Sequence, residues 1–193
     1  MSIKEYPDPL QLFEEWFAVA KNSEIQEPTA MALATVDPGG QPSVRMVLLK
    51  DYREGFVFYT NLESDKARDL QKNPRAALCF YWVDKQVRVR GTVEPVSDEE
   101  ADRYFASRSR QSQIGAWSSL QSRTMAGRFE LEKRVASHTM KFGLGAIPRP
   151  PFWSGFRLTP FKMEFWKQMP FRLHQRLLYT RSEKGWERSF LYP

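Results

Sequence analysis

The sequence predicts a mainly β fold of the α+β class, a small barrel of short strands with helices at its periphery. Short segments rich in Val, Leu, Phe, Thr and Tyr recur along the chain, and turns containing Gly, Pro or Asp separate them. Segments with helical apolar spacing lie between these strands. Because no linker, repeat or low-complexity tract divides the 193 residues, we expect a single domain over residues 1–193.

The N-terminal half begins with a predicted helix. Asp8-Pro9, followed by apolar residues at helical spacing, predicts this helix over residues 8–22, with Asp8 as its N-cap. A further short helix is expected at residues 64–71. Strands are expected at residues 30–36, 43–49, 55–60, 75–82 and 86–96, the last two forming a hairpin.

The C-terminal half alternates in the same way. Ser97-Asp98-Glu99-Glu100 has the form of a capping box and predicts a helix that runs through Tyr104 and Phe105. Another helix is expected over residues 127–142, and the Pro-rich segment 147–151 ends it. The strand pattern returns over residues 156–165, 172–179 and 186–191.

Composition narrows the function classes. The apolar fraction of 41% and the aromatic fraction of 14% are typical of an ordered globular protein. A single cysteine, Cys79, excludes an internal disulfide, and with no signal peptide or membrane span in the sequence we expect a cytoplasmic protein. The net charge of +6 suits a nucleic acid, a membrane surface or small phosphate ligands alike. Because the basic residues are scattered among acidic ones and no apolar run is long enough to span a membrane, neither a nucleic acid nor a membrane is the expected partner.

The sequence lacks two common sources of catalytic chemistry. It contains no Gly-rich dinucleotide or phosphate-binding fingerprint, and no Cys/His cluster that could hold a metal. If the protein is an enzyme, an organic cofactor is therefore expected to supply the reactivity.

The segment at 172–176, Arg-Leu-His-Gln-Arg, is the most informative one for function. In a strand, alternation places Arg172, His174 and Arg176 on one face. Two guanidiniums beside an imidazole suit a planar, anionic ligand. The alternative is a solvated strand face, which is weakened because only two histidines exist in the chain and this one lies among Trp, Phe, Leu and Tyr.

A second candidate cluster lies around two strand ends. Arg45 and Lys50 fall on opposite faces of a regular strand, so both reach one ligand only if the strand bulges or ends near Lys50. Two charges that cap a buried strand are an equal alternative. The segment 56–61 leads into a helix start at Ser64-Asp65-Lys66, which suits a phosphate, although Ser64 as a simple N-cap is somewhat favoured.

A third cluster consists of Tyr104, Arg108 and Ser112, whose spacing of four suits one helical face and a phosphate monoester. A helix break in the polar run 107–112, or a solvated helix end, is the open alternative.

Isolated residues complete the candidates. Gln86, Gln121 and Ser122 offer neutral polar groups that could bind a heterocycle's edge. Trp166 could stack on a flat ring, but a core position is the favoured interpretation.

Taken in order, these segments resemble the pyridoxine/pyridoxamine 5′-phosphate oxidase family over about residues 8–193. The resemblance is carried by PTAMALAT at 28–35, RMVLLK at 45–50, FVFYTN at 56–61, YFASRSRQSQIGAW at 104–117, QS at 121–122, EFW at 164–166 and RLHQR at 172–176. It implies an FMN-binding split β-barrel with peripheral helices, working as a homodimer with FMN at the subunit interface. It also implies oxidation of pyridoxamine or pyridoxine 5′-phosphate to pyridoxal 5′-phosphate, with O₂ as electron acceptor giving hydrogen peroxide.

The resemblance also implies residue roles, carried over by position. FMN would be contacted by Arg45, Met46, Val47, Leu48, Leu49, Lys50, Tyr59, Thr60, Lys66, Gln86, Gln121, Ser122, Trp166 and Arg176. The phosphorylated substrate would be held by Lys50, Tyr104, Arg108, Ser112, Arg172 and His174, of which Arg172 and His174 are the expected catalytic residues. The alternative is a flavin oxidase or flavin-binding protein of the same fold that acts on another heterocycle, such as a phenazine precursor.

Four departures from the family pattern carry expectations of their own. Asp65 stands where the family usually has Arg, so either FMN is held less tightly or Asp65 turns away as a helix-start residue. The turn after Trp166 lacks the usual Gly, so we expect a reshaped turn leading into Arg172. Gln175 stands in place of an Asp, and we expect this change to affect local packing or charge support more than chemistry. The chain also begins shortly before its first helix, whereas members often carry a longer arm, so slower turnover or looser specificity is expected.

Overall fold

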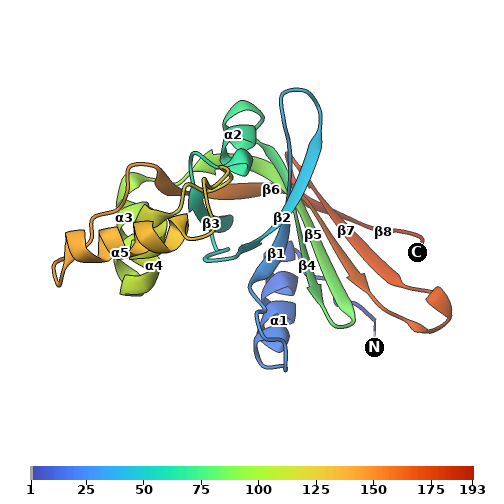
Figure 1. Ribbon diagram of the computed structural model, residues 1–193. Helices are drawn as coiled ribbons and strands as arrows, with labels where there is room; N and C mark the ends of the chain where they lie inside the picture. Colours follow the sequence, from blue (N-terminus) through green and yellow to red (C-terminus); the bar gives the residue numbers. More distant parts are fainter. Residues whose placement is uncertain (1) are drawn as a thin grey trace.

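The computed structural model describes residues 2–193 and consists of one antiparallel sheet with helices around it (Figure 1). The helices are α1 (Pro9–Lys21), α2 (Asp65–Lys72), α3 (Asp98–Ser107), α4 (Arg110–Ser118), α5 (Glu130–Phe142) and the short 3₁₀ helix η1 (Pro170–Arg172). The strands are β1 (Ala30–Val36), β2 (Pro42–Leu48), β3 (Phe56–Asn61), β4 (Arg75–Trp82), β5 (Lys85–Pro95), β6 (Trp153–Lys167), β7 (Gln175–Ser182) and β8 (Gly185–Phe190).

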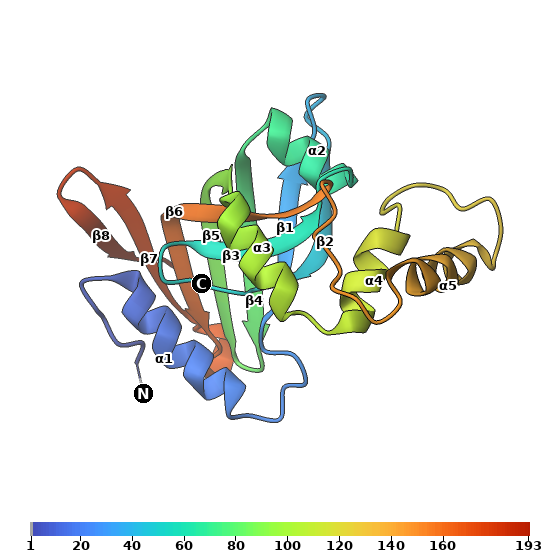
Figure 2. The ribbon, with the colours of Figure 1, turned by 90° about the vertical axis from the view of Figure 1, so that its left-hand side faces the viewer.

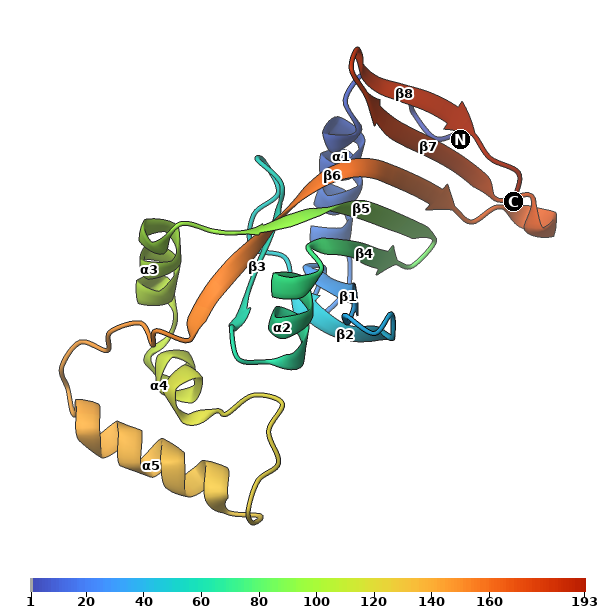
Figure 3. The same ribbon diagram turned by 90° about the horizontal axis from the view of Figure 1, so that it is seen from above.

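The sheet follows the order β2-β1-β4-β5-β6-β7-β8, and β3 pairs with the first part of β6. It does not close on itself, as expected of a split barrel. A register shift between Arg90 and Gly91 bends β5 against β6, and a Cβ at Gly91 would collide with the carbonyl of Thr159. Strand β6 is 15 residues long. It runs from the end of the molecule where α3 and α4 lie to the opposite end, beside β7 and β8 (Figure 3).

Helix α1 forms because its sequence supplies both a cap and an apolar face. The Asp8 side chain accepts from the N–H of Leu10, and Pro9 occupies the first turn. The buried face of α1 packs against the inner face of the sheet, where the ring of Phe13 contacts those of Phe56, Phe80 and Trp82. Figure 2 shows α1 alongside this sheet, with α4 and α5 beyond its other side. This aromatic core fixes the strands that carry the site.

The opposite face of the sheet, which we call the outer sheet face, is apolar over β2 and β4. Val44 is 68% exposed, and Met46 and Tyr81 are each 63% exposed. The same face continues onto β5, where Gln86 and Arg88 lie opposite Tyr81 and Cys79. Exposed apolar side chains that adjoin one another in this way are typical of an interaction surface.

Most predicted elements are present, and β1 and β4 have the predicted bounds. One prediction was wrong: residues 172–179 do not form one strand, because β7 begins only at Gln175. Pro170 has no N–H to donate, and Phe171 and Arg172 have φ of 56° and 60°, a left-handed conformation that no strand contains. Strand alternation therefore cannot place Arg172 and His174 on one face with Arg176.

The helix break that the sequence left open is also present. Helix α3 ends at Ser107, Arg108 is extended, and α4 begins after Ser109, whose side chain accepts from the N–H of Ser112. Across residues 2–193, no helix combines the length and the apolar character needed to cross a membrane.

Candidate functional site

A cavity of about 680 Å³ lies where the end of β2, strand β3, the start of α2 and the helices α3 and α4 meet. Most candidates from the first 121 residues line it: Met46, Val47, Leu48, Lys50, Tyr59, Thr60, Lys66, Tyr104, Arg108, Ser112 and Gln121. Because β2 ends at Leu48, Lys50 is free of strand alternation and reaches the cavity, while its N–H donates to the carbonyl of Val57. We call this cavity the main pocket.

Lys66 is the most unusual group of the main pocket. Its residue is only 8% exposed, and its Nζ donates to Gln121 Oε1 at 3.0 Å, Ser64 Oγ at 3.2 Å and Thr60 Oγ1 at 3.3 Å. These oxygens are all neutral. Burial lowers the pKa of Lys66, and the nearby positive charge of Arg45 lowers it further. A buried ammonium without a carboxylate contact within residues 2–193 suits an anionic ligand.

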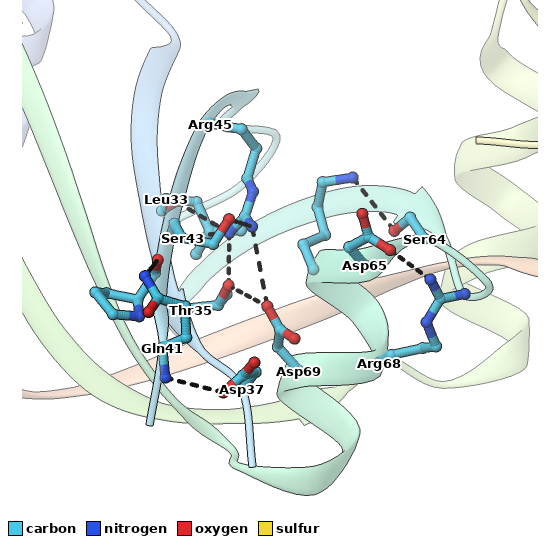
Figure 4. A network of polar contacts seen from close by, with 12 residues as sticks. Leu33, Thr35, Asp37, Gln41, Ser43, Arg45, Ser64, Asp65, Arg68 and Asp69 are labelled. Atoms are coloured by element: carbon cyan, nitrogen blue, oxygen red, sulfur yellow. Dashed lines mark hydrogen bonds and ion pairs between the residues drawn. The ribbon is translucent and has the colours of Figure 1, made fainter. Parts of the chain in front are cut away.

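Arg45 lies next to this group but turns away from the main pocket. Its guanidinium donates to Thr35 Oγ1 and Ser43 Oγ, each at 2.7 Å, and lies 3.9 Å from Asp69 Oδ2 (Figure 4). Thr35, which is fully buried, donates to the same carboxylate at 2.7 Å. This network ties α2 to β1 and β2, so Arg45 contributes charge beside Lys66 without lining the cavity.

Asp65, the departure at the start of α2, is paired within its own helix. Its carboxylate forms an ion pair with Arg68 one turn later, with 62% of the Asp65 side chain exposed (Figure 4). Its N–H donates to Ser122 Oγ at 3.3 Å. This geometry favours the second of the two alternatives, in which Asp65 turns away as a helix-start residue.

The opposite wall of the main pocket is aromatic and basic. The ring of Tyr59 stacks with that of Tyr104 at 4.0 Å and with that of Trp153 at 5.2 Å. The Arg108 guanidinium lies 4.8 Å from the Trp153 ring, and burial lowers the pKa of Arg108. Its Nη1 is buried and has no hydrogen-bond partner within residues 2–193. Such an orphaned donor is rare and indicates a position where a ligand oxygen belongs.

The Tyr59 side chain is held at two places, its ring by Gly155 and its hydroxyl by Glu100. A Cβ on Gly155 would lie 2.7 Å from Tyr59 Cδ1, so only glycine lets the ring lie against β6. The Tyr59 hydroxyl donates weakly to Glu100, at 3.4 Å, and Glu100 is paired with Arg157 at 2.7 Å. Burial and the Glu100 charge raise the pKa of Tyr59, so its phenol stays neutral.

Four of the remaining candidates form a second cluster on the outer sheet face: Gln86, Trp166, His174 and Arg176. Gln86, Trp166 and Arg176 are paired across β5, β6 and β7. The ring of His174 lies 4.7 Å from that of Trp166, and His174 Nδ1 accepts from the N–H of Met169 at 3.2 Å. Trp166 is partly exposed here, so the favoured core interpretation of this residue was wrong.

The two clusters lie at opposite ends of β6. Trp153 of the main pocket and Trp166 of the second cluster lie 13 positions apart on one continuous strand. At about 3.3 Å per residue, a straight strand of this length would separate them by roughly 40 Å, and no residue of the second cluster lines the main pocket. A single chain therefore does not bring the two clusters together.

The other candidates lie outside the main pocket. Leu49 is buried in the core and Ser122 lines a neighbouring cavity. Arg172 is exposed, and its side chain makes no hydrogen bond or ion pair within residues 2–193. The lining residues that the sequence did not indicate are Asn61, Ser109, Gly115, Ala116, Ser119 and Trp153. Asn61 and Ser109 adjoin candidates along the chain, whereas Trp153 enters only through the pairing of β3 with β6.

Comparison with known proteins identifies the family. Residues 20–141 match the family model described as pyridoxamine 5′-phosphate oxidase. The chain belongs to this family. Residues 153–193 match a second model, the pyridoxine 5′-phosphate oxidase C-terminal dimerisation region.

Relatives in this family cover nearly the whole chain. A Brucella canis protein named pyridoxine/pyridoxamine 5′-phosphate oxidase is 58% identical over 191 residues, covering 96% of this chain and 94% of the relative. A Brucella abortus protein (strain 2308) of the same name is also 58% identical, covering 96% and 92%.

Solved structures show the same fold. PhzG from Burkholderia lata, in complex with tetrahydrophenazine-1-carboxylic acid, superposes with a TM-score of 0.93 at 32% identity, covering 98% of this chain and 95% of that one. An FMN-binding protein from Nostoc punctiforme has a TM-score of 0.77 at 19% identity, covering 96% and 98%. The sheet is thus the split barrel that the family resemblance implied.

Proposed function

We propose that this protein is an FMN-dependent oxidase that converts pyridoxamine 5′-phosphate, pyridoxine 5′-phosphate or both to pyridoxal 5′-phosphate. O₂ is the final electron acceptor and is reduced to hydrogen peroxide. One observation carries the proposal: the main pocket contains two separate cations, the buried Lys66 and the half-buried Arg108, whose Nη1 is buried, and within residues 2–193 neither contacts a carboxylate. A cofactor and a substrate that each carry a phosphate need two such positions.

The residues around Lys66 fit the phosphate of FMN. Lys66, Thr60, Gln121 and Ser122 offer an ammonium, hydroxyls and an amide close to the start of α2, where the helix dipole also favours an anion. FMN, when bound, supplies the redox chemistry, taking two electrons from the substrate and passing them to O₂. Arg45, held by Thr35 and Asp69, adds a second positive charge behind Lys66.

The residues around Arg108 fit the phosphate of the substrate. Lys50, Tyr104, Arg108 and Ser112 line one wall of the main pocket and together offer two cations and two hydroxyls. The orphaned Arg108 Nη1 then donates to a phosphate oxygen. These groups bind and orient the substrate, and positioning of this kind is the protein's main contribution to such a reaction.

His174 and Arg172 are the proposed catalytic residues. Because His174 Nδ1 accepts from Met169, the neutral imidazole carries its proton on Nε2, where it can donate to or exchange a proton with the substrate. Arg172 is an unpaired, exposed guanidinium within residues 2–193, available for the same ligand. His174 belongs to the second cluster and Arg172 lies two residues before it, so both serve a substrate in the main pocket only across an interface.

A homodimer supplies that interface. The outer sheet face is apolar over β2 and β4, and residues 153–193 match a dimerisation region. Since no residue of the second cluster lines the main pocket of its own chain, the main pocket of one subunit is completed by Gln86, Trp166, His174 and Arg176 of the other. The flavin then lies between the two subunits.

The likeness to PhzG favours a second candidate function, oxidation of a heterocycle such as a reduced phenazine carboxylic acid. Such a ligand carries a carboxylate and no phosphate. The presence of Lys50, Tyr104, Arg108 and Ser112 in one pocket weighs against it, because four donors exceed the needs of one carboxylate.

One experiment tests the proposal and separates the two candidates. The protein is reconstituted with FMN, and pyridoxamine 5′-phosphate is added under anaerobic conditions while the flavin absorbance is followed. Bleaching by this compound, with recovery and pyridoxal 5′-phosphate release on admission of O₂, is the expected result. Bleaching by a reduced phenazine carboxylic acid alone would establish the second candidate, and no flavin binding would defeat both.

A further inference from the structure

We propose that Glu164 is a positioning residue, which orients the Arg176 guanidinium toward the flavin. The inference rests on the proposed function, in which Arg176 completes the main pocket of the partner subunit, and on the expectation from the family resemblance that Arg176 contacts FMN. Glu164 lies on β6, two residues before Trp166 on the same face of the sheet. It is the only carboxylate among the residues that line a cavity of about 240 Å³ on the outer sheet face, which also contains Arg88, Arg90, Lys162 and Arg176.

The contacts of Glu164 define a fixed arrangement. Its Oε1 accepts from Arg176 Nε at 2.9 Å and lies 2.8 Å from Arg176 Nη2. Its Oε2 is paired with Arg88. The residue is 7% exposed, and pairing with the two guanidiniums offsets the cost of burying its carboxylate.

A third contact completes the orientation of Arg176. Its Nη1 donates to the carbonyl of Tyr192 at 2.9 Å, and its own carbonyl accepts from the N–H of Leu191 at 3.0 Å. A guanidinium has five N–H groups, and these contacts engage three of them. One N–H on Nη1 and one on Nη2 remain, and the planar group can present them in only one direction.

Without Glu164, the Arg176 guanidinium would keep only one of its three engaged N–H groups, and one hydrogen bond alone does not fix that direction. Arg176 would keep one hydrogen bond to Tyr192 and would be repelled by Arg88, Arg90 and Lys162 in the same cavity. The guanidinium would then turn toward solvent, and its contact with the flavin would be lost although Arg176 itself is unchanged.

The test is a double-mutant cycle on FMN affinity, using Glu164→Gln, Arg176→Met and the double variant in the apoprotein. We expect Glu164→Gln alone to weaken FMN binding roughly tenfold, as for the loss of a charge-assisted contact. In the Arg176→Met background, the same substitution should change the affinity by less than about twofold. Equal effects in both backgrounds, or no effect in either, would overturn the inference.

Arg88→Met is the matched control, because it removes the other partner of the same carboxylate and leaves Arg176 in place. It should lower the thermal stability of the apoprotein while FMN affinity changes by less than about twofold. A loss of affinity equal to that of Glu164→Gln would instead assign Glu164 a purely structural role. If Glu164→Gln does not fold, Glu164→Asp is used in the same cycle with the same criterion. Failure of the wild-type protein to bind FMN would count against the proposed function itself, whereas normal wild-type binding with an unaffected variant would contradict only the role of Glu164.

Discussion

Lys66 Nζ lies 3.0 Å from Gln121 Oε1, although 55 positions separate the two residues in the chain. The contact joins α2 to the segment that follows α4 and encloses one end of the main pocket. Since each oxygen around Lys66 is neutral, the ammonium is held in place without being neutralised. This arrangement makes the charge of Lys66 available to a ligand.

Lys66→Met should therefore weaken FMN binding about 100-fold, because a buried phosphate would lose its ammonium partner. Riboflavin, which lacks the phosphate, should bind the variant and the wild-type protein within about twofold. Fluorescence titration of the apoproteins measures both affinities. Lys72→Met, in the last turn of the same helix, is the control and should leave both unchanged.

The affinity for FMN should also depend on pH. The pKa of Lys66 is lowered by burial, so in the apoprotein this group begins to lose its proton below its ordinary pKa of 10.5. FMN binding should weaken as the pH rises from neutral through that lowered pKa, since the neutral amine no longer attracts phosphate. Titrations at increasing pH, with riboflavin and the Lys66→Arg variant as controls, test this. Equal pH profiles for the wild-type protein and the Lys66→Arg variant would refute it.

Arg108→Gln should act on the substrate rather than on the flavin. Removal of the guanidinium takes away the orphaned donor, so KM for pyridoxamine 5′-phosphate should rise by about 10- to 100-fold. FMN affinity should stay within about twofold. Unphosphorylated pyridoxamine provides the control, and an equal loss for both substrates in steady-state kinetics would show that Arg108 does not bind the phosphate.

Gly155→Ala should disturb the aromatic wall of the main pocket. The new Cβ would lie 2.7 Å from Tyr59 Cδ1, so the stack of Tyr59 with Tyr104 and Trp153 must shift. We expect a loss of about 1–3 kcal/mol in the free energy of unfolding, measured by denaturant titration. Gly127→Ala, where nothing lies within 4 Å of the added Cβ, should change the stability by far less.

The outer sheet face should be needed for assembly. Val44→Glu places a charge on an apolar face that the proposed dimer buries, so light scattering should detect monomers. Val19→Glu on α1 is a matched control, because Val19 is 54% exposed and lies on a different surface. A dimer that persists in the Val44 variant would exclude this face as the interface.

Local patterns predicted most of the fold because the residues that favour each helix or strand lie within a few positions of one another. The cap at Asp8 and the alternation in β4 are examples, and both elements appear as expected. The sequence left open whether the strand that contains Arg45 bulges or ends near Lys50. In the structure β2 ends at Leu48, and Lys50 lines the main pocket. Gln175 accepts from the N–H of Ile3 at 2.8 Å, in agreement with the expectation that this departure affects local packing.

The prediction of secondary structure from the sequence failed where the backbone conformation departs from the one that the residue pattern indicates. The left-handed conformations of Phe171 and Arg172 interrupt what reads as a strand, and no composition signal marks them. Trp153 was missed because its place in the pocket arises from pairing between strands that are distant in the chain. That the chain forms one domain stays a prediction, although the pairing of β6 with β3 and β5 joins the two matched regions and supports it.

The central claim is that each site combines the main pocket of one subunit with the second cluster of its partner. Coexpression of Lys66→Met and Arg176→Met chains with different tags tests it directly. Mixed dimers are purified by both tags and assayed at an FMN concentration that saturates the wild-type protein but neither variant alone. If the sites are shared, each mixed dimer contains one intact site and should show about half the wild-type activity. If each site lies within one chain, no site is intact and the mixed dimers should be as inactive as either variant.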